Sequence, residues 1–222
     1  RLESDRAVPS ELEARRRLGE RVLADFEQLI DRLYPASQVP DAAGRATAAH
    51  AAFGRARFGL HVPRPELGAA LSTAGSPLLV TGEPGSGASC LVTTWADGWA
   101  AANPGATVLV HHCDADAAAG DFRLLAARVI DALGGDYDDA VDQLAEAPPA
   151  AVASALAQAL RSTALREAQE PAAALVVLDG VDQLAEGNPG DRVPDLRWLP
   201  ADLGDSPVRF VLTGSGERAR AA

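Results

Sequence analysis

One stretch, LLVTGEPGSGASCLVTTW at residues 78–95, constrains the fold of this chain more than any other. It opens with a short apolar run typical of a buried strand, and from Ala88 onward its apolar residues have helical spacing. The loop between these two parts holds three glycines, which adopt backbone conformations that other residues avoid. The stretch therefore predicts a strand, a tight loop and a helix that begins directly at the loop.

The loop fits the phosphate-binding pattern G-x-x-x-x-G-K-[ST], the P-loop, at every fixed position except the lysine. Gly82 and Gly87 take the glycine positions and Ser89 the last one, whereas Ala88 replaces the lysine. In such a loop, successive backbone N–H groups surround a phosphate and the helix N-terminus adds partial positive charge. Ser89 would offer its hydroxyl to Mg²⁺. The alternative is a glycine-rich turn that binds no ligand.

A second segment, ALVVLDGVDQL at residues 174–184, has the form of the Walker B strand that accompanies a P-loop. Its apolar run ends in Asp179, and ligands of open parallel sheets bind at the carboxyl ends of the strands. Asp179 would hold Mg²⁺ through water, and Asp182 could orient an attacking water. An aspartate that closes a strand is also common turn chemistry. The presence of both segments in this order favours a phosphate site.

Apolar strands and helical segments alternate from Pro77 onward. Continuous apolar strands separated by helices indicate a parallel sheet buried on both faces. We therefore expect an α/β fold, namely a three-layer P-loop NTPase sandwich with a parallel sheet, preceded by an N-terminal helical segment. Strands are expected at residues 77–82, 106–113, 173–179 and 207–214, and helices at residues 88–102, 121–135 and 149–168.

The segment before this region is expected to hold one amphipathic helix over residues 10–33, with Ser10 and Glu13 as a capping box. A linker should follow to residue 44, because it is punctuated by prolines and lacks periodicity. A second helix is expected over residues 44–59, and a short helix after Pro65.

Composition excludes several classes of protein. The net charge is −11 and every basic residue is arginine, so no concentrated basic face for nucleic acid is expected. No apolar run reaches the roughly 18–20 residues that span a bilayer, so no membrane partner is expected. Cys90 and Cys113 cannot form a disulfide framework, which favours a reduced, cytoplasmic location.

The run His111 to Asp114 contains four candidate metal ligands, but neighbouring strand residues point to opposite faces and cannot all converge on one ion. We expect a strand end near the phosphate site instead of a metal centre. Trp95 and Trp99 are expected in the core, and the acidic run at residues 134–146 is expected to be a solvated loop and the start of a helix.

Three segments, LVTGEPGSGAS, LVVLDGVDQL and RWLPADLGDSPVRFVLTGS, together resemble the NACHT-type P-loop NTPases of the STAND class. The likeness is to the branch that contains nephrocystin-3 and the telomerase-associated vault protein, in which a Trp-Leu-Pro stretch and a VRFVLT-like strand follow the Walker B segment. It covers roughly residues 45–216. It implies a nucleotide-binding domain at residues 45–222, C-terminally incomplete, after a helix and linker at residues 1–44.

The resemblance implies a switch that binds ATP or ADP with Mg²⁺. It also implies protein partners, including repeats that commonly follow such a domain, and self-association into homo-oligomers. By position it implies catalytic roles for Asp182, which would orient water, and for Thr213, which would be a sensor at the end of its strand. It also implies that Ser89 and Asp179 bind the metal. The residues it assigns to the nucleotide are Gly82, Glu83, Pro84, Gly85, Ser86, Gly87, Ala88, Ser89, Cys90 and Arg64.

Two departures from the family pattern bear on activity: Ala88 replaces the lysine, and Pro63 replaces a glycine before Arg64. A hydrogen bond to a charged group is worth about 1.5–3 kcal/mol, so losing the lysine weakens binding roughly ten- to a hundredfold. Without the lysine, the transition state loses more stabilisation than the bound nucleotide does, because catalysis of phosphoryl transfer depends mainly on stabilising charge.

Three functions stay open at this point. One is a nucleotide-binding switch with impaired hydrolysis, and another is a scaffold that keeps the fold but binds no nucleotide. The third is an active NTPase that uses another basic residue, for instance Arg64.

Overall fold

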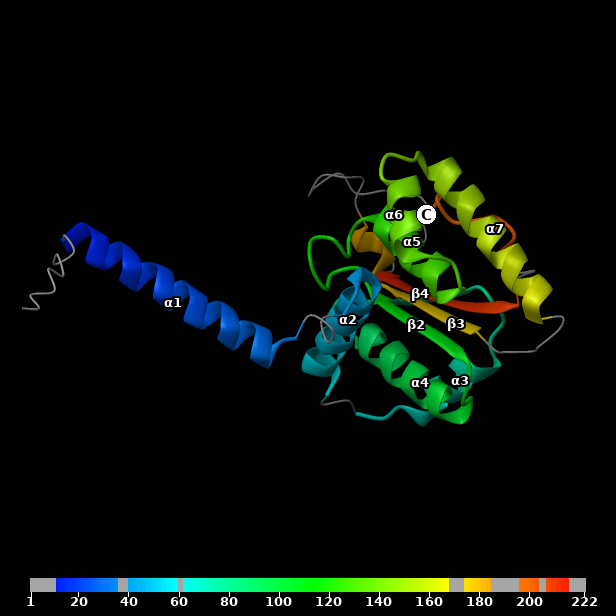
Figure 1. Cartoon of the computed structure of the whole chain (residues 1–222). Helices are drawn as coiled ribbons and strands as arrows, with labels where there is room; N and C mark the ends of the chain where they lie inside the picture. The colour runs from blue at the N-terminus through cyan, green and yellow to red at the C-terminus, as the bar shows by residue number, and fades with distance from the viewer. Residues whose placement is uncertain are drawn as a thin grey trace, which may run out of the picture. The chain divides into compact units, whose positions relative to one another are not determined.

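The structure, a computed structural model, describes residues 11–35, 40–59, 62–167, 174–184, 196–203 and 207–215. The chain divides into two units, residues 1–41 and 42–222 (Figure 1). The first unit contains a single described helix, α1 (Glu11–Leu33). All other described elements belong to the second unit.

α1 is the amphipathic helix that the sequence predicts, and it buries none of its residues. Its apolar side chains, including Leu18, Phe26 and Leu33, are exposed. Arginines pair with glutamates one turn away along its surface, at Arg15 with Glu11 for example. The predicted cap at Ser10 lies outside the described residues.

The second unit is built on a four-stranded, wholly parallel sheet with the strand order β1-β4-β3-β2. The strands are β1 (Leu78–Gly82), β2 (Thr107–His112), β3 (Ala174–Asp179) and β4 (Val208–Ser215). In register, Gly82 lies opposite Ser215 and His112 opposite Asp179. The carboxyl ends of all four strands therefore meet at one edge of the sheet.

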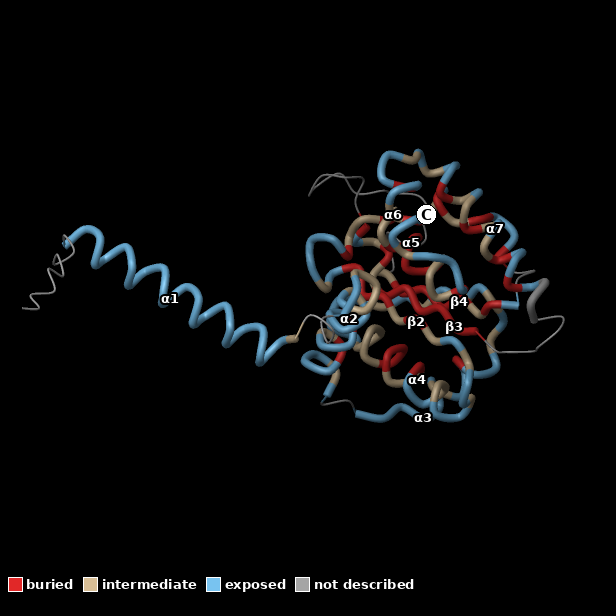
Figure 2. Tube along the Cα trace, viewed as in Figure 1, coloured by how far each residue is buried: buried red, intermediate tan, exposed pale blue. Residues whose placement is uncertain are grey.

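Helices cover both faces of this sheet (Figure 1). They are α2 (Ala42–Phe58), α3 (Pro65–Thr73), α4 (Ala88–Ala102), α5 (Phe122–Ala132), α6 (Tyr137–Leu144) and α7 (Pro149–Glu167). Val176 and Leu178 of β3 pack in the cluster formed with α5 and α7, whereas Leu175 and Val177 pack in the cluster formed with α3 and α4. Every residue of β3 is buried, which gives the red centre of Figure 2. The predicted α/β class and parallel sheet are confirmed.

Two elements differ from their predicted form. α2 begins at Ala42, inside the predicted linker, because alanines favour a helix over an open segment. The acidic run at residues 134–146 contains a complete short helix, α6, where a loop and a helix start were expected. Asp136 caps α6 by accepting a hydrogen bond from the Asp139 amide at 2.9 Å, and Leu144 is buried beneath it.

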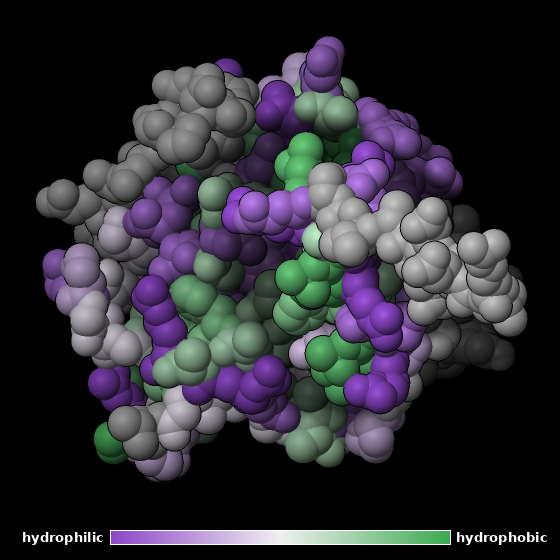
Figure 3. Space-filling model, turned by 60° about the vertical axis from the view of Figure 1, so that its left-hand side comes forward, coloured by the Kyte–Doolittle hydropathy of each residue, from purple (hydrophilic) through white to green (hydrophobic). Residues whose placement is uncertain are grey.

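None of the described helices is long and apolar enough to cross a bilayer. Hydrophobic side chains on the face in Figure 3 lie in separate patches between hydrophilic ones. Trp95 and Trp99, expected in the core, are partly buried against the apolar cluster on the α4 side of the sheet.

Core packing on the α5 side makes a direct stability prediction. Leu125→Ala should lower the free energy of unfolding by about 2–5 kcal/mol, because Leu125 is completely buried and its truncation leaves a cavity. Leu67→Ala is the matched control, since Leu67 is 39% exposed and should cost less than about 1 kcal/mol. Urea denaturation of both variants measures the difference, and equal losses would contradict this core assignment.

Candidate phosphate-binding site

The loop after β1 has the backbone conformation that its glycines allow. Gly85 and Gly87 have φ angles of +81° and +86°, a region that other residues rarely adopt. A Cβ at Gly82 would meet the hydroxyl of Ser86, so a larger residue there would require the Ser86 side chain to rotate. The Ser86 amide closes the turn by donating to the Glu83 carbonyl at 2.9 Å.

The loop leads directly into α4, whose first residue is Ala88. The amides in the first turn of a helix have no carbonyl partner within the helix, and the Gly87 cap offers no side chain to them. This end of the helix also carries partial positive charge. The N-terminus of α4 therefore offers N–H donors to an anion.

A pocket of about 500 Å³ lies over the loop and the carboxyl ends of β3 and β4. It brings together every site residue that the sequence predicts except Arg64. These residues are Gly82, Glu83, Pro84, Gly85, Ser86, Gly87, Ala88, Ser89, Cys90, Asp179, Asp182 and Thr213. The loop and the acidic end of β3 thus face one space, although Ser89 and Asp179 are 90 positions apart in the sequence.

The Asp179 carboxylate is the centre of a buried hydrogen-bond network. One oxygen accepts from the Thr213 hydroxyl at 2.5 Å, and the other lies 2.8 Å from Nδ1 of His112. The Ser89 hydroxyl also bonds to this carboxylate. Asp179 therefore joins the first turn of α4 to the ends of β2, β3 and β4.

These hydrogen bonds keep Asp179 ionised. Burial alone would raise the pKa of Asp179, but the bonds from His112, Thr213 and Ser89 outweigh it and hold the pKa below the usual value. The pKa of the neighbouring Cys113 thiol shifts the other way. Burial and the nearby negative charge of Asp179 raise this pKa well above the usual value. Cys113 is thus a buried neutral thiol.

Thr213 and Asp182 fix the turn that follows β3. The Thr213 hydroxyl accepts a hydrogen bond from the Gly180 amide at 2.9 Å while it donates to Asp179. Asp182 lies in the short 3-10 helix η2 (Val181–Gln183), where one carboxylate oxygen accepts from the hydroxyl of Ser215 at 3.0 Å. Both side chains are held at the pocket by β4.

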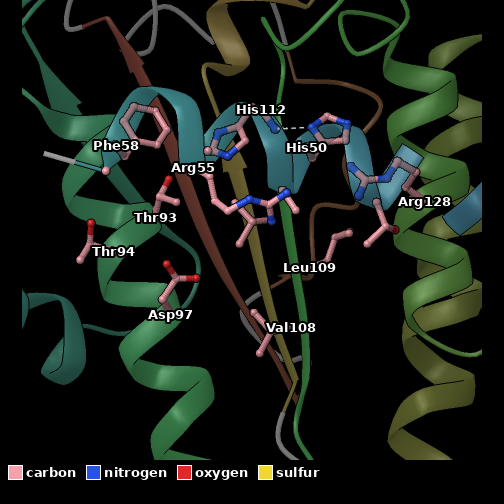
Figure 4. A pocket seen from close by; sticks show the side chains of 15 residues that line it. His50, Arg55, Phe58, Thr93, Thr94, Asp97, Val108, Leu109, His112 and Arg128 are labelled. Atoms are coloured by element: carbon pink, nitrogen blue, oxygen red, sulfur yellow. Dashed lines mark hydrogen bonds between the residues drawn. The ribbon is translucent and has the colours of Figure 1, made fainter. Parts of the chain in front are cut away.

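α2 adds contacts that the sequence did not predict. His112 donates its backbone N–H to Nδ1 of His50 at 3.1 Å (Figure 4). The His112 ring also lies 5.1 Å from the ring of Phe53 and 5.5 Å from that of Phe58, measured between centroids. One histidine therefore links α2 to the Asp179 carboxylate.

Two arginines lie near the loop: Arg64, which the resemblance assigned to the nucleotide, and Arg57, for which the sequence indicated no role. Arg64, expected at the nucleotide, has its guanidinium beside Gly87 and lines an adjoining apolar pocket with Leu67. Arg57 was not anticipated, yet it lines the loop pocket together with Asp114, and the two are 3.5 Å apart. Nothing in the pattern around Arg57 distinguishes it from the other arginines of that helix, so sequence gave no signal for it.

The chemistry of the pocket suits an anion together with a cation. The α4 amides can bind phosphate oxygens, whereas Ser89 and Asp179 carry the oxygen ligands that Mg²⁺ prefers. No group of three or more His, Cys, Asp or Glu side chains in the described part of the chain is arranged to hold a metal. Any Mg²⁺ here would therefore share its ligands with phosphate and water, which is how Mg²⁺ is commonly bound beside nucleotides.

Comparisons of the chain with protein-family models, with curated proteins and with solved structures found no match. A fold by itself does not determine activity, so the function has to be argued from the site.

The buried histidines make the pH dependence predictable. Burial lowers the pKa of His50 to about 2 and that of His111 to about 3, and both rings stay neutral in the folded state. Arg128 donates to Nδ1 of His111 at 2.8 Å, and the Ala119 carbonyl lies 2.8 Å from Nε2, an arrangement that suits a neutral ring.

Because the unfolded chain binds protons on these rings near pH 6.5 and the folded chain does not, stability should fall as the pH drops below 6.5. Each ring contributes up to about 1.4 kcal/mol per pH unit until its folded pKa is reached. Urea midpoints between pH 7 and pH 5 measure the loss. NMR of the folded protein provides the check, since titration of either ring near pH 6.5 would contradict the prediction.

Proposed function

We propose that residues 42–222 form a P-loop nucleotide-binding domain of the NACHT type in the STAND class, which binds ATP or ADP with Mg²⁺ and acts as a switch with impaired hydrolysis. The observation that carries this proposal is the single pocket in which the glycine loop, the N-terminus of α4 and the Asp179 carboxylate lie together. A glycine-rich turn without a ligand has no need of an ionised carboxylate at that position.

Each group has a role in this proposal. The amides from Gly85 to Ser89 would bind the phosphates, Ser89 would hold Mg²⁺ directly and Asp179 through water, and Asp182 would orient water. When bound, Mg²⁺ would neutralise part of the phosphate charge. Thr213 lies on β4, between the loop strand β1 and the Asp179 strand β3, and so contacts the carboxylate directly.

The missing lysine separates binding from hydrolysis. Main-chain amides and Mg²⁺ still stabilise the ground state, whereas the charge that develops in transfer lacks the cation that lysine supplies. We therefore propose slow or absent turnover together with measurable binding. A switch of this kind is controlled by which nucleotide is bound, and its partners are other protein domains.

Nucleotide should stabilise the folded protein. A thermal-shift series with ATP and ADP, each with and without Mg²⁺, should raise Tm with the largest rise in the presence of the metal, because a ligand that binds only the native state shifts unfolding. Ser89→Ala should reduce the Mg²⁺-dependent part of the rise. A Tm that does not move at millimolar nucleotide would favour the alternative, a scaffold domain that binds no nucleotide.

Restoring the lysine should tighten binding. Ala88→Lys is expected to lower the Kd for Mg-ATP about ten- to a hundredfold, since it adds a hydrogen bond from a cation to phosphate. Ala88→Gln is the control, because it adds a long side chain without the charge. Isothermal titration measures both, and an unchanged Kd for Ala88→Lys would show that the loop does not surround a phosphate.

A further inference from the structure

A phosphate bound in the loop pocket would need a positive side chain, and the structure offers one from outside the loop. Of the described residues that line the pocket, Arg57 is the only lysine or arginine. We propose that Arg57, from the last turn of α2, is the cation that binds the nucleotide phosphates in place of the absent lysine. This inference rests on the proposed nucleotide binding and names the residue that supplies its charge.

Arg57 is positioned at the pocket but only loosely held. Its guanidinium stacks over the ring of Phe53, 4.6 Å from the centroid, and its NH1 lies 3.5 Å from a carboxylate oxygen of Asp114. The side chains of this pair are 59% and 46% exposed. A charged hydrogen bond is about 2.7–2.9 Å long, so the contact with Asp114 is an ion pair without a short hydrogen bond.

A change of partner from Asp114 to phosphate is therefore favourable. Exposed ion pairs contribute little to stability, and the separation of this one adds to that weakness. A guanidinium makes two parallel hydrogen bonds to a phosphate, which a lysine ammonium cannot do with the same geometry. Asp114 holds Arg57 at the edge of the pocket until a stronger anion arrives.

The helix that carries Arg57 is fixed to the site. His50 accepts the backbone N–H of His112, and Phe53 and Phe58 flank the ring of that histidine, which in turn bonds to Asp179. Phe58, next to Arg57, lines the pocket itself. The last turn of α2 is thus tied through His112 to the Asp179 carboxylate, and Arg57 lines the same pocket as that carboxylate.

Arg64 is the competing candidate. Its guanidinium lies beside Gly87, but its side chain lines the adjoining pocket with Leu67 and Leu78, on the side of the loop that faces β1 and α3. Arg57 faces the side that carries Asp179 and Asp182. Because the phosphates that react must lie near these carboxylates, the geometry assigns the role to Arg57.

The test compares Mg-ATP binding by isothermal titration in the full chain. Arg57→Gln should raise the Kd about tenfold or more, and Arg57→Lys should retain most of the affinity, because it keeps the charge. Arg55→Gln is the matched control, since it removes the same charge two residues away. Arg55 points into a different pocket, between α2 and α4 over β2 (Figure 4), and its loss should change the Kd less than twofold.

Three further measurements sharpen the assignment. Asp114→Asn should tighten binding, because it frees Arg57 and removes a negative charge from the pocket. In the Ala88→Lys background, Arg57→Gln should raise the Kd much less than it does with Ala88 in place, since lysine and Arg57 would bind the same phosphates and their effects would not add. The Kd for AMP, which lacks the outer phosphates, should change least in the Arg57→Gln variant.

The outcomes separate the two proposals. If the chain with Ala88 binds no nucleotide, the proposed function fails and this inference fails with it. If it binds Mg-ATP and Arg57→Gln behaves like Arg55→Gln, the function stands and the role of Arg57 is overturned. A tenfold loss in Arg64→Gln with none in Arg57→Gln would assign the cation to Arg64 instead.

Discussion

The buried carboxylate of Asp179 is the interaction on which the site depends. An ionised carboxylate is costly to bury unless hydrogen bonds replace its water, and here Thr213, His112 and Ser89 supply them. These three donors come from β4, β2 and the first turn of α4. Removing any one of them leaves a buried charge partly unsatisfied, so the chemistry of one residue also fixes the mutual positions of three strands and a helix.

This constraint extends to α2 through His112. The ring that bonds to Asp179 is flanked by Phe53 and Phe58, and the backbone of the same residue bonds to His50. Movement of α2 would therefore disturb the hydrogen bonds of the carboxylate, and a change at the carboxylate would disturb the packing of α2. A ligand that alters Asp179 consequently has a physical route to a helix on the outside of the sheet, which is what a nucleotide-dependent switch requires.

Sequence predicted the parts of this structure that are local. Apolar strand runs located all four strands, and the glycine spacing located the loop, because both depend on backbone preferences of neighbouring residues. Asp179 could be placed at the site because ligands bind at the carboxyl ends of parallel strands, whereas Thr213 was expected there only from the family resemblance. His50 and Arg57 could not, because their contacts join α2 to the end of β2 across 62 positions in one case and 57 in the other. No periodicity in the sequence encodes such an approach, and Arg64, which the resemblance assigned to the nucleotide, has its guanidinium beside Gly87 and lines the adjoining pocket.

The way the loop is held shows what alanine at position 88 changes and what it leaves unchanged. Positive φ angles at Gly85 and Gly87 set the course of the main chain, and neither angle depends on the side chain at position 88. Ala88 begins α4 as an excellent helix former would. Exchange of lysine for alanine can therefore remove the charge and leave the arrangement of amides intact. Shape and charge are separable in this loop, so a charge supplied from α2 would act on a loop whose main-chain course is already set.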